Sequence, residues 1–167
     1  MLGRREAPIV ANGLVIREAH RRDLDQLMEL WTEMMDYHRT FDDRFQFAHG
    51  HHRELERHFV DCMKAREARV YVADEDGRLK GYILGGIHRR KMIEPAGTYG
   101  FISYMSVSTD CRRQGIGRSL ATTLIGWFKK EGVTSVELLT LEINPVSNAF
   151  WESLGFGQYL RLLRKDF

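Results

Sequence analysis

Two neighbouring arginines followed by two closely spaced glycines mark the stretch of this sequence with the clearest chemistry. The run RRQGIG, residues 112–117, follows an apolar, strand-like segment and precedes a helix-like one. Glycine has no Cβ, so the backbone can approach a ligand closely. A helix that begins here directs unpaired N–H groups and the positive end of its dipole into the loop, and the guanidinium groups add full positive charge. This combination predicts a binding site for a diphosphate group.

Several kinds of phosphate-binding loop share these features. A Walker-type loop is excluded, because it ends in Gly-Lys-Ser or Gly-Lys-Thr, whereas Gly117 is followed by Arg118 and the glycine spacing differs. A dinucleotide-binding loop requires a third glycine where Leu120 stands, together with alternating strands and helices. That interpretation remains a rival. A basic helix start that binds no ligand is the plainest alternative.

Length and charge limit the class of protein. The chain has 167 residues, which suits one domain with a proper core. Its 25 basic and 23 acidic residues give a net charge of +2, which offers no electrostatic case for binding nucleic acid. No apolar run approaches the ~20 residues of a membrane span. Cys62 and Cys111 stand in dissimilar contexts, so we expect free thiols and a cytoplasmic protein.

The hydrophobic pattern predicts a mixture of strands and helices. Apolar residues three or four positions apart predict helices, β-branched or alternating runs predict strands, and glycine, proline and Asp-Gly predict the breaks. Residues 1–13 are expected to form a flexible tail. In chain order we then expect a strand at 14–16, helices at 23–38 and 53–66, a hairpin of strands at 69–73 and 79–87, a strand at 99–108, a helix at 116–130, a strand at 133–141, a helix at 145–154, and a last strand or hairpin at 156–167.

Three of these expectations bear on function. The antiparallel hairpin disfavours a dinucleotide-binding domain, which is built from parallel strands. Gly85 and Gly86 predict a bulge or a close backbone approach within their strand. The apolar run 133–141 predicts a central strand, joined to the strand at 99–108 by a right-handed crossover through the 116–130 helix.

A second motif stands one helix and one strand after the first. Asn144 and Pro145 predict a helix N-cap and a first helical residue, and the run continues with Ala149, the aromatic pair Phe150-Trp151 and then Gly155-Phe156. In this order and at this separation, the two motifs resemble those of the GNAT N-acetyltransferases. The resemblance extends from about residue 14 to residue 167.

The resemblance implies a fold, a cosubstrate and an assembly. The implied fold is α/β: a single domain at 14–167, with a central mixed, mostly antiparallel, twisted sheet of roughly six to seven strands, splayed in the middle and flanked by about four helices. The loop at 112–117 would hold the pyrophosphate of acetyl-CoA. Members of the family often pair, so a homodimer is among the assemblies that the resemblance allows.

Residue by residue, the resemblance implies three groups of cofactor contacts. The backbone of the strand end would bind the pantetheine arm and thioester as an added strand would, the loop and helix start would hold the pyrophosphate, and the second motif would lie along the pantetheine. Two plainer roles stay open: Asn144 as only a helix cap, and Val107 as only a sheet residue. The three groups are Met105, Ser106 and Val107; Arg112, Arg113, Gln114, Gly115, Ile116, Gly117, Arg118 and Ser119; and Asn144, Asn148 and Trp151.

In this family an amine attacks the acetyl thioester directly, so the amine must first be neutral. A free lysine side chain, with a pKa near 10.4, is neutral in about one molecule in two thousand at pH 7. The site therefore needs a base, a desolvating pocket or both, and a backbone N–H near Val107 is the expected donor to the developing oxyanion. Many relatives place a tyrosine in the final helix as the acid for the departing thiolate. Here Trp151 occupies that position, and an indole N–H is far too weak an acid.

Candidates for these proton-transfer roles stand elsewhere in the chain. Tyr104 is the acid that we would test first, with Tyr159 or a water as substitutes, although Tyr104 could equally be a packed strand aromatic. Glu94 and Glu142 are the candidate bases. Of these four, Tyr104 and Glu142 are our predicted catalytic residues.

Two polar clusters remain without an assigned function. Asp36, Asp42 and Asp43 would either attract an amine substrate or form a solvated loop. Four histidines lead into the 53–66 helix, but neither a cysteine nor an acidic residue completes a set of metal ligands, and the spacing is not His-Glu-x-x-His. We therefore predict a polar helix face and no metal; the histidines are His49, His51, His52 and His58.

The sequence thus predicts an acetyl-CoA-dependent N-acetyltransferase that acts on a primary amine of a small molecule or peptide. The alternative is an acyl-CoA-binding module without turnover, which Trp151 and the lack of Asp, Glu or His at 99–108 would support. The expected partners are acetyl-CoA and an amine, with neither nucleic acid nor membrane.

Overall fold

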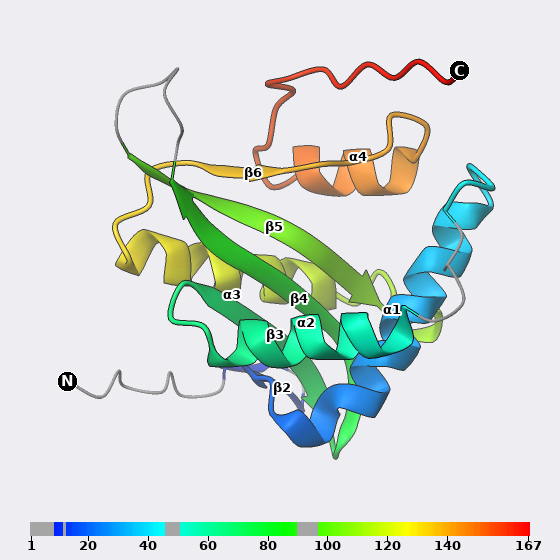
Figure 1. Ribbon diagram of the computed structural model, residues 1–167. Coiled ribbons are helices and arrows are strands. Elements are labelled where there is room, and N and C mark those ends of the chain that lie inside the picture. Colours follow the sequence, from blue (N-terminus) through cyan, green and yellow to red (C-terminus); the bar gives the residue numbers. More distant parts are fainter. Residues whose placement is uncertain (1–8, 12, 46–50, 90–96) are drawn as a thin grey trace.

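A six-stranded sheet with helices on both faces forms the described part of the molecule (Figure 1). The structure, a computed structural model, describes residues 9–11, 13–45, 51–89 and 97–167. Helices α1 (Leu24–Arg39) and α2 (His52–Lys64) lie on one face of the sheet, and α3 (Ile116–Lys130) lies on the other. Helix α4 (Pro145–Glu152) packs into the same core as α3. No helix within these residues has the length and apolar character needed to cross a membrane.

The strands follow chain order across the sheet. The first five are antiparallel to their neighbours, and the last is parallel to the fifth, as a crossover through α3 requires. The predicted single α/β domain, with a mixed sheet and four helices, is confirmed. The strands are β1 (Ile9–Ala11), β2 (Leu14–Glu18), β3 (Ala68–Glu75), β4 (Arg78–Arg89), β5 (Thr98–Val107) and β6 (Val136–Leu138).

Two hydrophobic cores form, one on each face of the sheet. The apolar stripe of α1 is buried in the core beneath α1 and α2. The stripe of α3 fills the opposite core. The buried residues of these two helices are Leu27, Met28, Leu30, Trp31 and Met34 on α1, and Ile116, Leu120, Ala121, Leu124, Trp127 and Phe128 on α3.

A β-bulge beside Gly85 decides which way the side chains of β5 face. Leu84 pairs with Tyr104, but Gly85 pairs with Ile102, so β5 has one residue more than β4 at this point. The predicted close approach is also confirmed, because a Cβ on Gly85 would lie 2.8 Å from the carbonyl oxygen of Phe101. Residues two apart in a regular strand share a face. The bulge breaks that rule: Ile102 packs in the α3 core, whereas Tyr104 packs against the α1 and α2 core.

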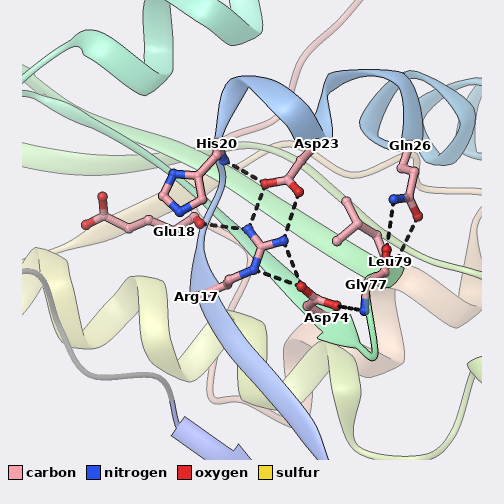
Figure 2. Close-up of polar contacts among 8 residues, drawn as sticks. All are labelled: Arg17, Glu18, His20, Asp23, Gln26, Asp74, Gly77 and Leu79. Carbon is pink, nitrogen blue, oxygen red and sulfur yellow. Dashed lines mark hydrogen bonds and ion pairs between the residues drawn. The ribbon is translucent and has the colours of Figure 1, made fainter.

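An ion-pair network fixes the start of α1 to the sheet (Figure 2). The guanidinium of Arg17, on β2, donates to both carboxylate oxygens of Asp23 at 2.7 and 2.8 Å, and to Asp74 on β3 at 2.9 Å. Burial alone would raise the pKa of Asp23, but the bonds from Arg17 and from the backbone N–H of His20 outweigh burial and lower it. The pKa of Arg17 is raised in return.

Gln26 extends this attachment to the β3–β4 turn. Its side chain accepts a bond from the N–H of Leu79 at 2.9 Å and donates to the carbonyl of Gly77 at 3.1 Å (Figure 2). The N–H of Gly77 donates to Asp74 at 2.8 Å, which joins the turn to the network around Arg17. The first turn of α1 is therefore held at a fixed place over the sheet.

The C-terminal part of the chain departs from the sequence expectations. The 133–141 segment is not a central strand: β6 is the last strand in the sheet, and Leu139 just beyond it is 73% exposed. Residues 156–167 contain neither helix nor strand, so the predicted last strand or hairpin is wrong. Apolar residues predict burial only where something covers them. Phe156 packs against Trp151, but Leu139 and the apolar residues at 159–167 stay exposed. At the other end, residues 9–11, expected within the tail, pair with β2 as β1.

Candidate functional site

The predicted phosphate loop opens α3 with backbone N–H groups that no described residue caps. Gly115 is the N-cap residue, with a φ of 84°, a conformation that suits glycine. No side chain caps this end of the helix, and no turn or loop bond of the described chain uses the N–H groups of residues 114–118. The start of α3 thus presents the free donors and the positive dipole that a diphosphate requires.

Gly117 brings this loop into close contact with the second motif. A Cβ on Gly117 would lie 3.3 Å from the ring of Phe150 on α4 and 3.6 Å from the side chain of Val107 at the end of β5. The first of these distances is tighter than ordinary van der Waals contact. One contact therefore accounts for both motif residues. Phe150 forms a wall of the loop, and because Gly117 has no side chain, the start of α3 can lie against it.

The three arginines of the loop have different surroundings. Arg118 donates to the hydroxyl of Ser153 at 3.1 Å and so links α3 to the segment after α4. Arg113 has a φ of 61°, which costs an arginine of order 1–3 kcal/mol and is typical of functional sites. Its side chain is exposed beside the free N–H groups. Among the three, Arg113 has the position best suited to pairing with a bound anion.

Arg112 braces the loop. Its Nε donates to the carbonyl of Val107 at 3.2 Å, and its guanidinium lies 5.1 Å from the ring centre of Tyr37 on α1. The carboxylate of Glu33, also on α1, lies 3.9 Å from the same guanidinium. The structure thus places Arg112 between β5 and α1, where it positions the loop.

Strands β5 and β6 pair over only three residues of each. The pairs are Gly100 with Val136, Phe101 with Glu137 and Ile102 with Leu138. Beyond Ile102, β5 continues to Val107 while β6 has ended, so no strand in the described residues pairs with residues 104–107 on that side. A free strand edge that leads directly into the phosphate loop can accept an extended, amide-bearing ligand as an added strand. The edge contains three of the predicted contact residues, Met105, Ser106 and Val107.

The two asparagines of the second motif have structural roles. Asn144 is buried, and its side-chain oxygen accepts a bond from the N–H of Ser147 at 3.1 Å, which confirms the predicted N-cap. Asn148 donates to the carbonyls of Leu141 and Glu142 at 3.2 and 3.0 Å. Together they hold the turn between β6 and α4.

Trp151 is packed rather than presented to a ligand. It is 7% exposed, and its ring lies 4.9 Å from that of Phe150 and 5.2 Å from that of Phe156. Glu142 is exposed in the turn after β6, and no bond or ion pair of the described residues brings its carboxylate to β5. Glu94 lies outside the described residues. Among the described residues, the predicted base Glu142 is thus not brought to Tyr104.

The structure instead brings a histidine to Tyr104. The half-buried ring of Tyr104 makes edge contacts with Trp31 on α1, at 6.5 Å between ring centres, and with His58 on α2, at 6.2 Å. His58 is exposed, and its Nε2 lies 3.8 Å from the sulfur of Cys62. Sequence reasoning missed this neighbour, because it assigned His58, with three other histidines, to a polar helix face. The only local signal was Cys62, one helical turn further on.

Neither cysteine is an activated nucleophile. Burial, and then the neighbouring Asp61, raise the pKa of Cys62. Burial, and then a hydrogen bond with Asp110, raise the pKa of Cys111. Both thiols are free, as expected, and both stay protonated at neutral pH. The described residues also contain no group of three or more His, Cys, Asp or Glu placed to hold a metal ion.

The predicted acidic patch is largely neutralised, but a second acidic surface lies close by. Asp42 binds Arg44 at 2.6 Å, which holds its pKa down at about 2, and Asp36 pairs with Arg39 at 3.1 Å. A groove of about 580 Å³ runs along α1, within the size range of small-molecule sites. Its lining residues are Asp25, Met28, Glu29, Thr32, Glu33, Asp36 and His52.

The groove and the loop meet at the end of β5. Glu33 lines the groove and accepts a bond from the N–H of Thr109, two residues after β5, at 2.8 Å. On the loop itself the hollow beside Gln114, Gly115 and Ser119 measures only about 110 Å³.

Comparisons with known proteins agree on one family. The acetyltransferase (GNAT) family matches residues 24–156. The probable N-acetyltransferase camello of Xenopus laevis is 32% identical over 90 residues, which are 54% of this chain and 39% of that protein. The uncharacterized N-acetyltransferase MJ1207 of Methanocaldococcus jannaschii is 26% identical over 162 residues, 90% of this chain and 66% of that protein. The chain thus spans less than two thirds of either relative.

A solved structure shares the fold. The aminoglycoside N-acetyltransferase AAC(6')-Iy in complex with CoA matches with a TM-score of 0.76 at 17% identity, covering 95% of this chain and 99% of that one. At this identity the likeness concerns the fold alone. Because the family match includes the phosphate loop and both asparagines of the second motif, this chain belongs to the GNAT acetyltransferase family.

Proposed function

We propose that this protein is an acetyl-CoA-dependent N-acetyltransferase that acetylates a primary amine. The observation that supports this most directly is the continuity of two open features, the free N–H groups at the start of α3 and the free edge of β5 at residues 104–107. A diphosphate suits the first feature, and an extended arm with amide groups suits the second. CoA has both parts, joined end to end.

The residues around the loop fit this cosubstrate. Because Gly117 has no Cβ, a ligand can approach the backbone at the start of α3 closely. Arg113 adds an exposed positive charge beside it. The backbone of Met105 to Val107 would hold the arm, and an N–H near Val107 would stabilise the oxyanion. Bound acetyl-CoA would supply the thioester that the amine attacks.

His58 and Tyr104 are the groups that we assign to proton transfer. An imidazole can accept a proton from an ammonium group near neutral pH, and His58 would pass that proton to water. The phenol of Tyr104 would donate a proton to the departing sulfur as the nitrogen–carbon bond forms and the carbon–sulfur bond breaks. The second amine proton, lost as the amide forms, then replaces the one that Tyr104 gave. The net result is one proton released to solvent.

The acidic groove supports a cationic acceptor. Three of its four carboxylates on α1, those of Glu29, Glu33 and Asp36, lie within 4 Å of an arginine, so Asp25 is the one with no ion pair among the described residues; Glu33 joins the groove to the end of β5. The acceptor class proposed is therefore a small molecule or peptide that bears one or more ammonium groups. This property also suits the fold neighbour AAC(6')-Iy, which is named an aminoglycoside N-acetyltransferase.

One observation favours a second function, that of an acyl-CoA-binding module without turnover. Trp151 stands where many relatives have an acid and is packed in the core, and β5 has no ionisable carboxylate or imidazole of its own. Thiol release from acetyl-CoA over a panel of primary amines separates the two functions. Transfer predicts saturable release with at least one amine and thermal stabilisation by CoA but not by NAD. Stabilisation by CoA without thiol release would favour the binding module. The absence of both stabilisation and release would contradict both functions.

A further inference from the structure

One tyrosine hydroxyl lies in the core beneath α1 and α2 with nothing bonded to it. Tyr82, on β4, is 0% exposed, and its hydroxyl has no hydrogen-bond partner among the described residues. A buried hydroxyl without a partner destabilises a fold, because it has lost its bonds to water and gained none in return. A phenylalanine would fill nearly the same space without this cost. Core packing alone therefore does not account for the hydroxyl of Tyr82.

The register of the sheet places Tyr82 beside Tyr104. Tyr82 pairs with Ser106 across the ladder of β4 and β5, and Tyr104 stands two residues before Ser106. Both tyrosines pack in the core beneath α1 and α2, so their side chains lie on the same face of the sheet. Diagonal neighbours of this kind are about 7–8 Å apart, a separation that aromatic side chains can span.

Consecutive residues of α2 contact the two tyrosine rings. The ring of Tyr82 lies 5.6 Å from that of Phe59, and the ring of Tyr104 lies 6.2 Å from that of His58, between ring centres. Burial raises the pKa of Tyr82 well above its ordinary value, and the nearby Tyr104 raises it further. The phenol of Tyr82 therefore keeps its proton at neutral pH and remains a hydrogen-bond donor.

We propose that Tyr82 is a positioning residue whose hydroxyl donates a hydrogen bond to the oxygen of Tyr104 when Tyr104 gives up its proton. This role rests on the proposed function, in which Tyr104 protonates the departing sulfur of CoA. The oxygen–hydrogen bond of Tyr104 breaks, a sulfur–hydrogen bond forms, and the donor on Tyr82 stabilises the negative charge left on Tyr104. Tyr82 keeps its own proton throughout, and Tyr104 regains one from the reacting amine.

A donor in this position would affect the rate and not the binding of substrates. The hydroxyl of Tyr82 makes no bond to Tyr104 while Tyr104 is protonated, so the bond forms only as charge develops. An interaction made only in the transition state raises kcat without tightening the binding of substrate. Because the surrounding core is apolar, a bond to a charged oxygen is strong there.

Tyr82→Phe removes only the hydroxyl and tests this role. We expect kcat to fall about tenfold, with KM for the amine and affinity for CoA unchanged. Because the lost hydroxyl was unpaired, the melting temperature should be no more than about 3 °C below that of the wild type. The matched control is Tyr71→Phe, a buried tyrosine on β3 in the opposite core, which should keep the wild-type kcat.

The same substitution in a Tyr104→Phe background shows whether Tyr82 acts through Tyr104. A thiolate can leave without an acid, so Tyr104→Phe should retain a slow, measurable rate. No charged oxygen forms at residue 104 in that background, so Tyr82→Phe should lower kcat no further.

Three results would overturn this role and leave the proposed acetyl transfer intact. They are a wild-type kcat in Tyr82→Phe, an equal loss of kcat with and without Tyr104, and a larger fall in melting temperature, which would show that the hydroxyl is bonded in the folded protein. A wild-type protein that releases no thiol from acetyl-CoA with any primary amine would instead contradict the proposed function, and the role of Tyr82 with it.

Discussion

The two faces of β5 would contribute different kinds of groups to the proposed reaction. On the α3 side the candidate cofactor site consists of backbone: free N–H groups at residues 114–118, a glycine against Phe150, and the open edge of a strand. On the α1 and α2 side the candidate acceptor site consists of side chains: Tyr104 between Trp31 and His58, with an acidic groove nearby.

This difference has a physical origin. A backbone site depends on local geometry, so a short motif with the right glycines specifies it. A side-chain site depends on how distant elements pack, and here that packing depends on the bulge at Gly85 and on the network that holds α1. Cofactor binding and acceptor chemistry should therefore fail separately when each side is altered.

The largest effect is expected on the cofactor side. Gly117→Asp places a Cβ against Phe150 and a carboxylate beside the proposed diphosphate, so we expect CoA affinity to fall about a thousandfold, or about 4 kcal/mol. The matched control is Gly126→Asp on the same helix, where a Cβ meets nothing within 4 Å. Calorimetry with CoA measures both variants. Equal affinity in the two would rule out the loop as the cofactor site.

The next effect concerns the framework of the acceptor side. Arg17→Met leaves the buried Asp23 carboxylate without its main partner, and breaking such a pair costs about 3 kcal/mol of unfolding free energy. Chemical denaturation measures the loss. Below the unfolding transition, CoA affinity should stay at the wild-type value, because the loop does not touch this network. A variant as stable as the wild type would show that the network does not fix α1.

A similar loss, in rate rather than stability, is expected for the proposed base. His58→Gln should lower kcat/KM for the amine about a hundredfold and change its pH profile, while leaving CoA affinity unchanged. His52→Gln, an exposed histidine on the same helix, is the control and should keep the wild-type profile. An unaltered pH profile in His58→Gln would exclude the imidazole as the base.

The Arg17 network also predicts a pH dependence. The pKa of Asp23 is lowered in the folded state, so its carboxylate stabilises the fold fully above the unfolded value of about 3.9. That contribution is lost as the pH falls from there through the lowered pKa. Unfolding free energies of the wild type and Arg17→Met, measured at a series of pH values, should converge in this acidic window. A difference that stays constant down to the lowest pH would argue against a charged pair.

The smallest effect separates charge from shape in the loop. Arg113→Gly removes an exposed cation and relieves its positive φ, so we expect about tenfold weaker CoA binding with unchanged or slightly higher stability. Asp76→Gly is the control, since Asp76 has a φ of 51° in the distant β3–β4 turn. If the two variants bind CoA alike, Arg113 contributes no charge to the site.

Local patterns predicted most helices and strands and the Asn144 cap, because helix periodicity, the Asp-Gly turn and the cap each act over a few residues. That the loop at 112–117 binds CoA stays a prediction. The position of β6 at the sheet edge was not predictable, since an apolar run does not show whether another strand pairs with it or another segment packs over it. The same limit applies to residues 156–167. His58 was missed because its neighbour, Tyr104, lies 46 positions away in the sequence. Tyr104 also faces α2 only because the bulge beside Gly85 reverses the alternation of side chains along β5.

Backbone amide NMR during a titration with CoA is the most direct test of the central claim. We predict saturable shifts of the amide signals of Gly115, Ile116 and Gly117, together with those of Met105 to Val107 on the free edge of β5. The amides of the Asp76–Gly77 turn should stay in place. Shifts that are absent from the start of α3 at millimolar CoA, or that appear only elsewhere, would contradict the assignment of this loop and edge as the cofactor site.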